Sequence, residues 1–272
     1  MDNAAGKRRS SSRSAISVRG RYRMVVTDQP AEDPEPVVAS VDTCRWRFPD
    51  PSTADADGLL GFGADLEPET LVHAYRQGIF PWPHPGMPLP WFSPDPRGII
   101  RLDGLRTSRS LRQRLRNSGW ETTVDRAFEA VVAACAERYR PEGTWIVPEL
   151  RAAYSRLHRL GHAHSLEVWR GEDLLGGLYG VSVGGVFTGE SMFHRATDAS
   201  KVALVDLVDR LAEAGGRLID VQLVTDHLAA LGARAMPRGK YLSLLHDVRD
   251  EPVRLPSERR TVARLAPGRG VG

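Results

Sequence analysis

Cysteine is scarce in this sequence. Only Cys44 and Cys135 occur among 272 residues, far apart and outside any paired motif. This spacing argues against a disulfide framework and a cysteine-based zinc site, and it fits a reducing compartment. Long apolar runs are also missing, since no stretch approaches the roughly 18 to 20 residues of a membrane-spanning helix. The N-terminus starts with basic residues but no apolar core follows, so we expect no secretory signal and a cytoplasmic protein without membrane attachment.

Positive charge is unevenly distributed along the chain. The net charge is +3, yet residues 1–23 hold seven Lys or Arg against Asp2, so the remainder carries −3. Residues 1–40 have no hydrophobic periodicity and pass from a basic, Ser-rich segment into an acidic, Pro-containing one, which predicts a disordered tail. A basic arm that helps to hold RNA is the functional alternative. The folded part must bind any nucleic acid through a local basic patch.

Composition changes sharply after this tail. Residues 41–97 contain many Gly, Pro and aromatic residues and predict a small N-terminal domain of mixed structure. A helix opens with Pro68 beside acidic residues, and Gly78 ends it. A stiff, proline-rich loop follows over residues 81–96 and presents aromatic rings, among them Trp82. Such rings either cap a small core or form a platform on which a base stacks, and both interpretations stay open.

Residues 105–117, LRTSRSLRQRLRN, predict a helix with an unusual surplus of arginine. Ser108 suits the N-cap, and Leu111 with Leu115 forms an apolar pair at i, i+4. No acidic residue occurs in this segment, so the arginines lack the partners that a solvated charged helix normally has. Their mutual repulsion costs stability unless an anion supplies the counter-charge, and phosphate is the obvious candidate. The arginines concerned are Arg106, Arg109, Arg112 and Arg116, with Arg114 beside them.

Residues 162–193 predict three antiparallel strands joined by tight turns. The third strand, within GGVFTGESMF, brings Glu190 among apolar residues such as Val186 and Met192. A carboxylate in such surroundings costs several kcal/mol unless it is paired. Glu190 is therefore a candidate functional residue, and a partly exposed carboxylate at a strand end is the structural alternative.

A second polar pair falls on a strand predicted over residues 218–224, LIDVQLV. The period of two puts Asp220 and Gln222 beside Leu218 and Val224 on one face. Two polar groups on an otherwise apolar face belong either to a functional site or to a structural pair that loop backbone satisfies. Residues after 247 predict a disordered C-terminal tail. Helices are predicted over residues 125–137, 148–160, from Ser200 to Gly215, 225–231 and 240–247.

Nine segments in order, from about Gly58 to Leu242, resemble the leucyl/phenylalanyl-tRNA–protein transferase family. They are GLLGFGADL, AYRQGIFPW, WFSPDPRGII, GTWIVPEL, AYSRLHRLGHAHSLEVW, GGLYGV, GESMF, ASKVAL and LIDVQLVTDHLAALGA. The resemblance implies an α+β fold, with a small N-terminal domain over 41–97 followed by a GNAT-like acyltransferase domain over 98–247. The central sheet of the second domain is expected to be mostly antiparallel. The long N-terminal extension departs from the shorter family pattern.

The resemblance also implies an activity. The family moves leucine or phenylalanine from charged tRNA to the N-terminal Lys or Arg of acceptor proteins, which marks them for N-end rule degradation. An aminoacyl ester is already activated, so we expect no cofactor and no metal, and we expect a monomer. The runner-up is an acetyl-CoA-dependent GNAT N-acetyltransferase, which needs a Gly-rich turn before a helix N-terminus. A third possibility is a non-catalytic tRNA-binding protein.

The site residues follow from the same resemblance. Asp220 orients Gln222, whose side-chain oxygen accepts hydrogen from the attacking amine, and whether Asp220 is also the base stays open. Glu190 holds the acceptor's Lys or Arg side chain or places its amine. Leu178, which stands where the family often has Met, lines the aminoacyl pocket together with Phe187. Further implied contacts are Trp82 and Trp145 to the terminal adenosine of the tRNA, and Arg106, Arg109, Arg112 and Arg116 to its phosphates.

Overall fold

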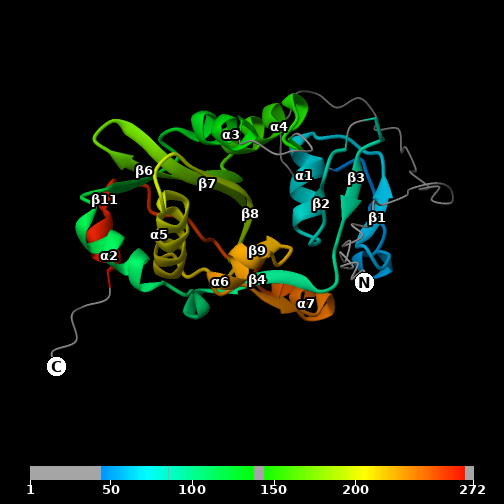
Figure 1. Cartoon of the computed structure of the whole chain (residues 1–272). Coiled ribbons are helices and arrows are strands. Elements are labelled where there is room, and N and C mark those ends of the chain that lie inside the picture. Colours follow the sequence, from blue (N-terminus) through cyan, green and yellow to red (C-terminus); the bar gives the residue numbers. More distant parts are fainter. Residues whose placement is uncertain (1–43, 85, 138–143, 267–272) are drawn as a thin grey trace, which may run out of the picture.

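The computed structural model describes residues 44–84, 86–137 and 144–266, so the predicted tail over 1–40 lies outside the described residues. An eight-stranded sheet with the order β10-β4-β9-β8-β7-β6-β5-β11 forms the centre of the molecule (Figure 1). All neighbouring strands are antiparallel except β8 and β9, which run parallel. The prediction of an α+β fold with a mostly antiparallel central sheet is confirmed. The strands are β4 (Arg97–Arg101), β5 (Glu121–Val124), β6 (Ala163–Arg170), β7 (Asp173–Val183), β8 (Val186–His194), β9 (Leu218–Gln222), β10 (Arg234–Met236) and β11 (Arg260–Thr261).

Helices cover both faces of this sheet. On one face, α3 (Phe128–Glu137) and α4 (Pro148–Arg159) bury residues in the same cluster as Tyr179 and Val181 of β7. On the other face, α2 (Arg109–Asn117) and α5 (Ala199–Glu213) pack with Leu166 and Leu178. After α6 (Asp226–Ala230), the chain rejoins the sheet as strand β10. Helix α7 (Arg238–Val248) follows β10.

The N-terminal segment forms a separate three-stranded sheet with the order β1-β3-β2. Its strands are β1 (Leu59–Phe62), β2 (Phe80–Pro81) and β3 (Pro90–Phe92), so the predicted loop over 81–96 contains strand residues as well. Helix α1 (Pro68–Tyr75) has Pro at its first position, as predicted. The helix ends before Gly78, whose φ of +73° reverses the chain toward β2.

One buried cluster joins the N-terminal segment to the larger sheet. Phe48, Leu71 and Trp91 pack in the same cluster as Tyr154 of α4 and Tyr241 of α7. The predicted domain boundary at residue 97 coincides with the start of β4. Because the apolar core crosses that boundary, the division into two domains stays a prediction.

The predicted disordered tail over 248–272 is wrong for residues 248–266. Strand β11 pairs with β5, and Val262 of the 3-10 helix that follows is fully buried. Arg264 forms ion pairs with Asp206 and Asp209 of α5. This segment has no hydrophobic period of its own, and its order comes from partners about fifty residues or more away in sequence. Residues 267–272 lie outside the described part.

Neither a membrane span nor a metal cluster is found in the described ranges. No helix there is long and apolar enough to cross a bilayer. Nor do three His, Cys, Asp or Glu side chains of those ranges come together as a metal ion would need. His164 of β6 instead places Nδ1 2.7 Å from Oδ2 of Asp125.

Candidate active site

A β-bulge in β8 places Glu190. Tyr179 of β7 pairs with Ser191 and Gly180 pairs with Gly189, which leaves Glu190 as an extra residue in the ladder. Val186 and Phe193 lie in the same buried cluster although they are seven residues apart, a spacing that puts residues on opposite faces of a regular strand. The extra residue at the bulge returns Val186 and Phe193 to the same face of the sheet. It also turns the Glu190 side chain toward the place where the sheet meets α1 and α4.

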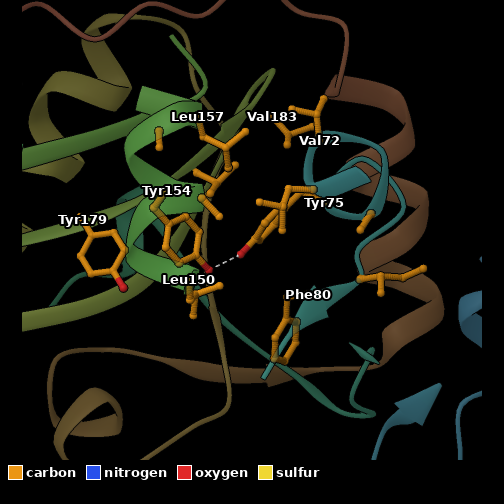
Figure 2. Close-up of a cluster of buried hydrophobic side chains, with 14 of the residues drawn as sticks. Val72, Tyr75, Phe80, Leu150, Tyr154, Leu157, Tyr179 and Val183 are labelled. Carbon is orange, nitrogen blue, oxygen red and sulfur yellow. Dashed lines mark hydrogen bonds between the residues drawn. The ribbon is translucent and has the colours of Figure 1, made fainter. Parts of the chain in front are cut away.

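Glu190 is buried and accepts three side-chain hydrogen bonds. The Tyr75 hydroxyl donates to Oε1 at 2.8 Å, and the Tyr154 hydroxyl donates to Oε2 at 2.9 Å. Figure 2 shows the two tyrosines pointing toward one another from α1 and α4. The Gln222 amide nitrogen donates to Oε1 at 3.0 Å. Three segments far apart in sequence therefore converge on one carboxylate.

Burial raises the pKa of Glu190 to about 7, and the hydrogen bonds from Tyr75 and Tyr154 limit the rise. The negative charge of Asp220 adds to it, while Arg97 opposes it. Desolvation penalises the charged form of a carboxyl, and hydrogen bonds to that form favour it. Glu190 is thus able to exchange a proton near neutral pH.

Asp220 lies deeper than Glu190, and both of its carboxylate oxygens accept hydrogen bonds. Arg97 holds it in a bidentate pair, with Nε 2.8 Å from Oδ1 and Nη2 2.6 Å from Oδ2. The Tyr241 hydroxyl donates to Oδ2 at 2.8 Å, and the Gln222 backbone N–H donates to Oδ1 at 2.9 Å. Neither Asp220 nor Arg97 has appreciable exposure, at 0% and 1%. Burial alone would lower the pKa of the Arg97 guanidinium, but the charge and hydrogen bond of Asp220, together with Tyr241 and Glu190, raise it overall.

Strand β9 ends at Gln222, so the predicted strand over 218–224 is two residues too long. Gln222 has a φ of +62°, a left-handed conformation that turns the chain out of the ladder. Asp220 stabilises this turn by accepting the Gln222 N–H, and Leu223 and Val224 are exposed. Because an ionised carboxylate can only accept, Glu190 fixes the amide nitrogen of Gln222 toward itself. Strained conformations of this kind cluster at functional sites.

A cavity of about 410 Å³ lies beside Glu190 and Gln222. Its apolar walls come from β7, β8, β9, α5 and α6, and its far wall carries two half-buried tryptophans. Phe187 is not among its lining residues: the side chain is fully buried, and its ring packs against Gly180. Five of the other predicted site residues line the cavity, and Asp220 lies behind it, bonded to the Gln222 backbone, whereas the four predicted arginines do not line it. The main lining residues are Trp82, Trp145, Leu178, Glu190, Met192, Leu204, Ile219 and Gln222.

The arginine helix lies away from the N-terminal segment. In Figure 1, α2 and β11 stand at one end of the molecule, and α1 with β1 to β3 stands at the other. Ser108 accepts the Leu111 N–H at 3.1 Å as the predicted N-cap, and Leu111 and Leu115 are buried. The arginines of this surface meet no carboxylate within the described part of the chain: Arg106, Arg109, Arg112 and Arg116.

Sequence reasoning missed the residues that hold the two carboxylates. The rings of Tyr75 and Tyr154 lie in the buried core, as expected for aromatic residues on the apolar faces of helices. Their hydroxyl partner could not be predicted, since it requires the packing of α1 against α4. Arg97 carried one available signal, a cation beside Gly98 at the start of an apolar strand, which indicates a buried partner.

Comparison with known proteins gives a consistent result. A family model described as "Leucyl/phenylalanyl-tRNA protein transferase" matches residues 99–246, and the model of the N-terminal domain of that family matches residues 64–95. A leucyl/phenylalanyl-tRNA–protein transferase of Nitratidesulfovibrio vulgaris is 52% identical over 210 residues, which cover 76% of this chain and 90% of the relative. One from Anaeromyxobacter sp. (strain Fw109-5) is 55% identical over 207 residues, covering 75% and 88%. One from Chromohalobacter salexigens is 56% identical over 200 residues, covering 73% and 78%.

These matches first establish a class: the protein is a transferase that works with aminoacyl-tRNA. The chain belongs to the leucyl/phenylalanyl-tRNA–protein transferase family. A solved structure of L-PGS from Bacillus licheniformis aligns with a TM-score of only 0.33 at 14% identity, covering 56% of this chain and 51% of the other.

Proposed function

We propose that the cavity beside Glu190 and Gln222 is the site where Leu or Phe passes from charged tRNA to the N-terminal Lys or Arg of an acceptor protein. The observation that carries this proposal is the hydrogen bond between Gln222 and Glu190 in the wall of a mostly apolar cavity. The polar pair suits an amine, and the apolar end suits the side chain of leucine or phenylalanine. Leu178, Met192 and Ile219 supply that end.

Gln222 is proposed to bind the attacking amine. Because its amide nitrogen faces Glu190, its oxygen is available to accept a hydrogen from the amine. Asp220 supports this geometry through the Gln222 backbone, so we assign it a positioning role. Glu190, which lines the same cavity, suits the cationic acceptor. Phe187 supports the pocket from beneath, through the buried cluster that it shares with Leu178.

The tRNA is proposed to enter at the tryptophans and to follow the arginine helix. Trp82 and Trp145 are half-buried in the cavity wall and offer ring faces for the terminal adenosine. Arg109 and Arg116 of α2 are exposed and lack ion pairs within the described residues, as a phosphate contact requires. With charged tRNA as donor, the cytoplasm is the expected location and N-end rule degradation the expected fate of the acceptor.

We also propose that the larger sheet belongs to a GNAT-like acyltransferase domain. An antiparallel sheet with one parallel pair, β8 and β9, and a site where these two strands meet suits a GNAT-like acyltransferase domain. The family match does not favour the acetyl-CoA alternative. No cofactor is needed for the proposed step, because the aminoacyl ester is already activated.

One assay tests the proposal. The enzyme is mixed with tRNA carrying labelled Phe and a peptide that begins with Arg, and a parallel reaction contains labelled acetyl-CoA instead. We expect label to move to the α-amine of the peptide only from Phe-tRNA. Transfer from acetyl-CoA, or equal transfer to a peptide that begins with Asp, would contradict the assignment.

A further inference from the structure

Three buried oxygen-bearing groups form a closed ring behind the cavity. The Tyr75 hydroxyl lies 2.8 Å from Oε1 of Glu190, the Tyr154 hydroxyl lies 2.9 Å from Oε2, and the two hydroxyls are 2.8 Å apart. Figure 2 draws the contact between the two tyrosines. Both tyrosines are almost completely buried, and they belong to α1 and α4 while Glu190 belongs to β8.

The number of protons in this ring depends on the charge of Glu190. The ring has three oxygen–oxygen contacts, and each tyrosine hydroxyl supplies one proton. When Glu190 is ionised, both hydroxyls donate to it and the contact between the tyrosines has no proton. A proton on Glu190 completes the ring, because Glu190 then donates to Tyr75, Tyr75 to Tyr154, and Tyr154 back to Glu190. The ring thus has a place for one further proton.

The surroundings keep the tyrosines as donors. Burial and the charge of Glu190 raise the pKa of both Tyr75 and Tyr154 well above the ordinary value, so neither hydroxyl loses its proton. Glu190, in contrast, titrates near neutrality. The other titratable or charged groups around it are Arg97 of β4, Tyr179 of β7, Asp220 of β9, and His227 of α6 in the same cavity.

We infer that the Tyr75–Tyr154–Glu190 ring receives the proton that the α-ammonium of the acceptor loses before it attacks the aminoacyl ester. This inference rests on the proposed function. Glu190 is the catalytic residue that takes the proton, and the two tyrosines are positioning residues. The ammonium and the carboxylate become an amine and a carboxylic acid. The amine attacks the ester carbon, its second proton passes to the leaving ribose oxygen, and Glu190 releases the first proton to solvent.

Asp220 is a poorer candidate for this proton. Its two oxygens already hold Arg97, Tyr241 and the Gln222 backbone, and the carboxylate has no exposed surface. A proton on Asp220 would have to displace one of these donors and leave the Arg97 charge uncompensated. Glu190 gains a donor contact on protonation, whereas Asp220 loses one.

Infrared titration tests the ring without any substrate. Difference spectra between the wild-type enzyme and Glu190→Gln isolate the carbonyl band of the protonated Glu190. We expect this band to disappear with a midpoint near pH 7. The midpoint should rise by about one pH unit in Tyr75→Phe or Tyr154→Phe, since each loses a donor to the ionised form. Tyr241→Phe removes the same hydroxyl from Asp220 instead and should leave the midpoint unchanged.

The pH dependence of kcat/KM tests the role in transfer. If Glu190 takes the proton of a bound ammonium, the profile is a bell with an acid limb near pH 7 and a basic limb near the amine pKa of about 8. Tyr75→Phe should move only the acid limb upward. Glu190→Gln should lower kcat/KM about 100-fold or more. Retained activity in Glu190→Gln would show that the protonated acid is the required form, and would overturn the inference.

Other outcomes are equally decisive. A wild-type rate that rises to a plateau, with the same profile in Tyr75→Phe, would overturn the inference while leaving the proposed transfer intact. An acid limb that moves in Tyr241→Phe but not in Tyr75→Phe would assign the proton to Asp220. Absence of any transfer by the wild type would contradict the proposed function itself, and the infrared midpoint would still report the proton uptake of the ring. Either tyrosine variant suffices if the other does not fold.

Discussion

Two buried acids lie at the centre of the site, and they differ in how their charge is compensated. Asp220 is paired with a buried cation, Arg97, and further donors surround it. Within the described residues, the donors that Glu190 receives are neutral: two tyrosines and an amide. A carboxylate beside a buried guanidinium stays charged, whereas one among neutral donors exchanges its proton more readily. This contrast supports the roles proposed above, positioning for Asp220 and proton transfer for Glu190.

Because the Arg97–Asp220 ion pair is buried, removing its cation should destabilise the protein. Arg97→Met leaves the Asp220 charge buried without its cation, and we expect a loss of about 3 to 5 kcal/mol in the free energy of unfolding. Urea unfolding followed by circular dichroism measures it. Arg101→Met, in the same strand, is the control, because Arg101 and its partner Asp103 are exposed. Equal stability of the two variants would contradict the buried-pair account.

The raised pKa of Glu190 predicts how the stability of the protein depends on pH. Between about pH 4.5 and 7 the folded carboxyl holds a proton that the unfolded one has lost, so the native state binds more protons. The resulting stabilisation is complete below about pH 4.5 and disappears as pH rises through about 7. We expect wild-type stability relative to Glu190→Gln to fall by up to about 3 kcal/mol between about pH 5 and about pH 8. Urea midpoints at both pH values measure the difference, and a constant or growing one would contradict it.

At the scale of single residues, the sequence predicted the polar residues of the site but not the side chains that hydrogen-bond to them. Glu190, Asp220 and Gln222 stand out because each interrupts an apolar strand. Their contacts join β8 and β9 to α1, α4 and α7, and no local pattern encodes such long-range packing. The sequence also did not predict the positive φ of Gln222, since no sequence pattern marks a glutamine whose backbone is in the left-handed conformation.

At the scale of elements, α2 combines a buried apolar edge with an uncompensated basic face. Leu111 and Leu115 anchor the helix, and the 3-10 helix that contains the buried Val262 packs in the same cluster. The sequence predicted α2 from its cap, its apolar pair and its arginines, all of which are local features. It did not predict the C-terminal segment that supports α2, because that segment is ordered by contacts with β5 and α5.

The basic face of α2 makes a prediction about tRNA binding. Replacing Arg109, Arg112 and Arg116 with Gln removes three phosphate contacts and keeps helix propensity. We expect weaker binding of tRNA and a slope of log K against log salt that is smaller by roughly 2 to 3. Filter binding at several salt concentrations measures both. An unchanged slope would contradict a phosphate contact.

A matched control comes from the same helix. Gln113 and Asn117 are exposed polar residues of α2, so replacing both with Ala changes its surface without changing its charge. The affinity and the salt slope should then match those of the wild type. A loss equal to that of the arginine variant would mean that the shape of the helix, and not its charge, matters.

At the scale of the whole molecule, the site lies where the N-terminal segment meets the larger sheet. Tyr75 and Trp82 come from the first part, whereas Tyr154, Glu190 and Gln222 come from the second. Neither part alone contains the proton-accepting ring or the cavity. The site therefore requires the shared buried core, because this core holds α1 and α4 close enough for the Tyr75 and Tyr154 hydroxyls to form a hydrogen bond.

The central claim is that Gln222 acts in the transfer step itself. Gln222→Ala is the sharpest change, because Asp220→Ala would also leave Arg97 without its partner. The measurement compares the single-turnover rate of Phe transfer to an Arg-starting peptide with the Kd for Phe-tRNA. We predict a rate about 100-fold lower and a Kd within about twofold of the wild type. A normal rate, or a loss of tRNA affinity that accounts for the whole decrease, would contradict the claim.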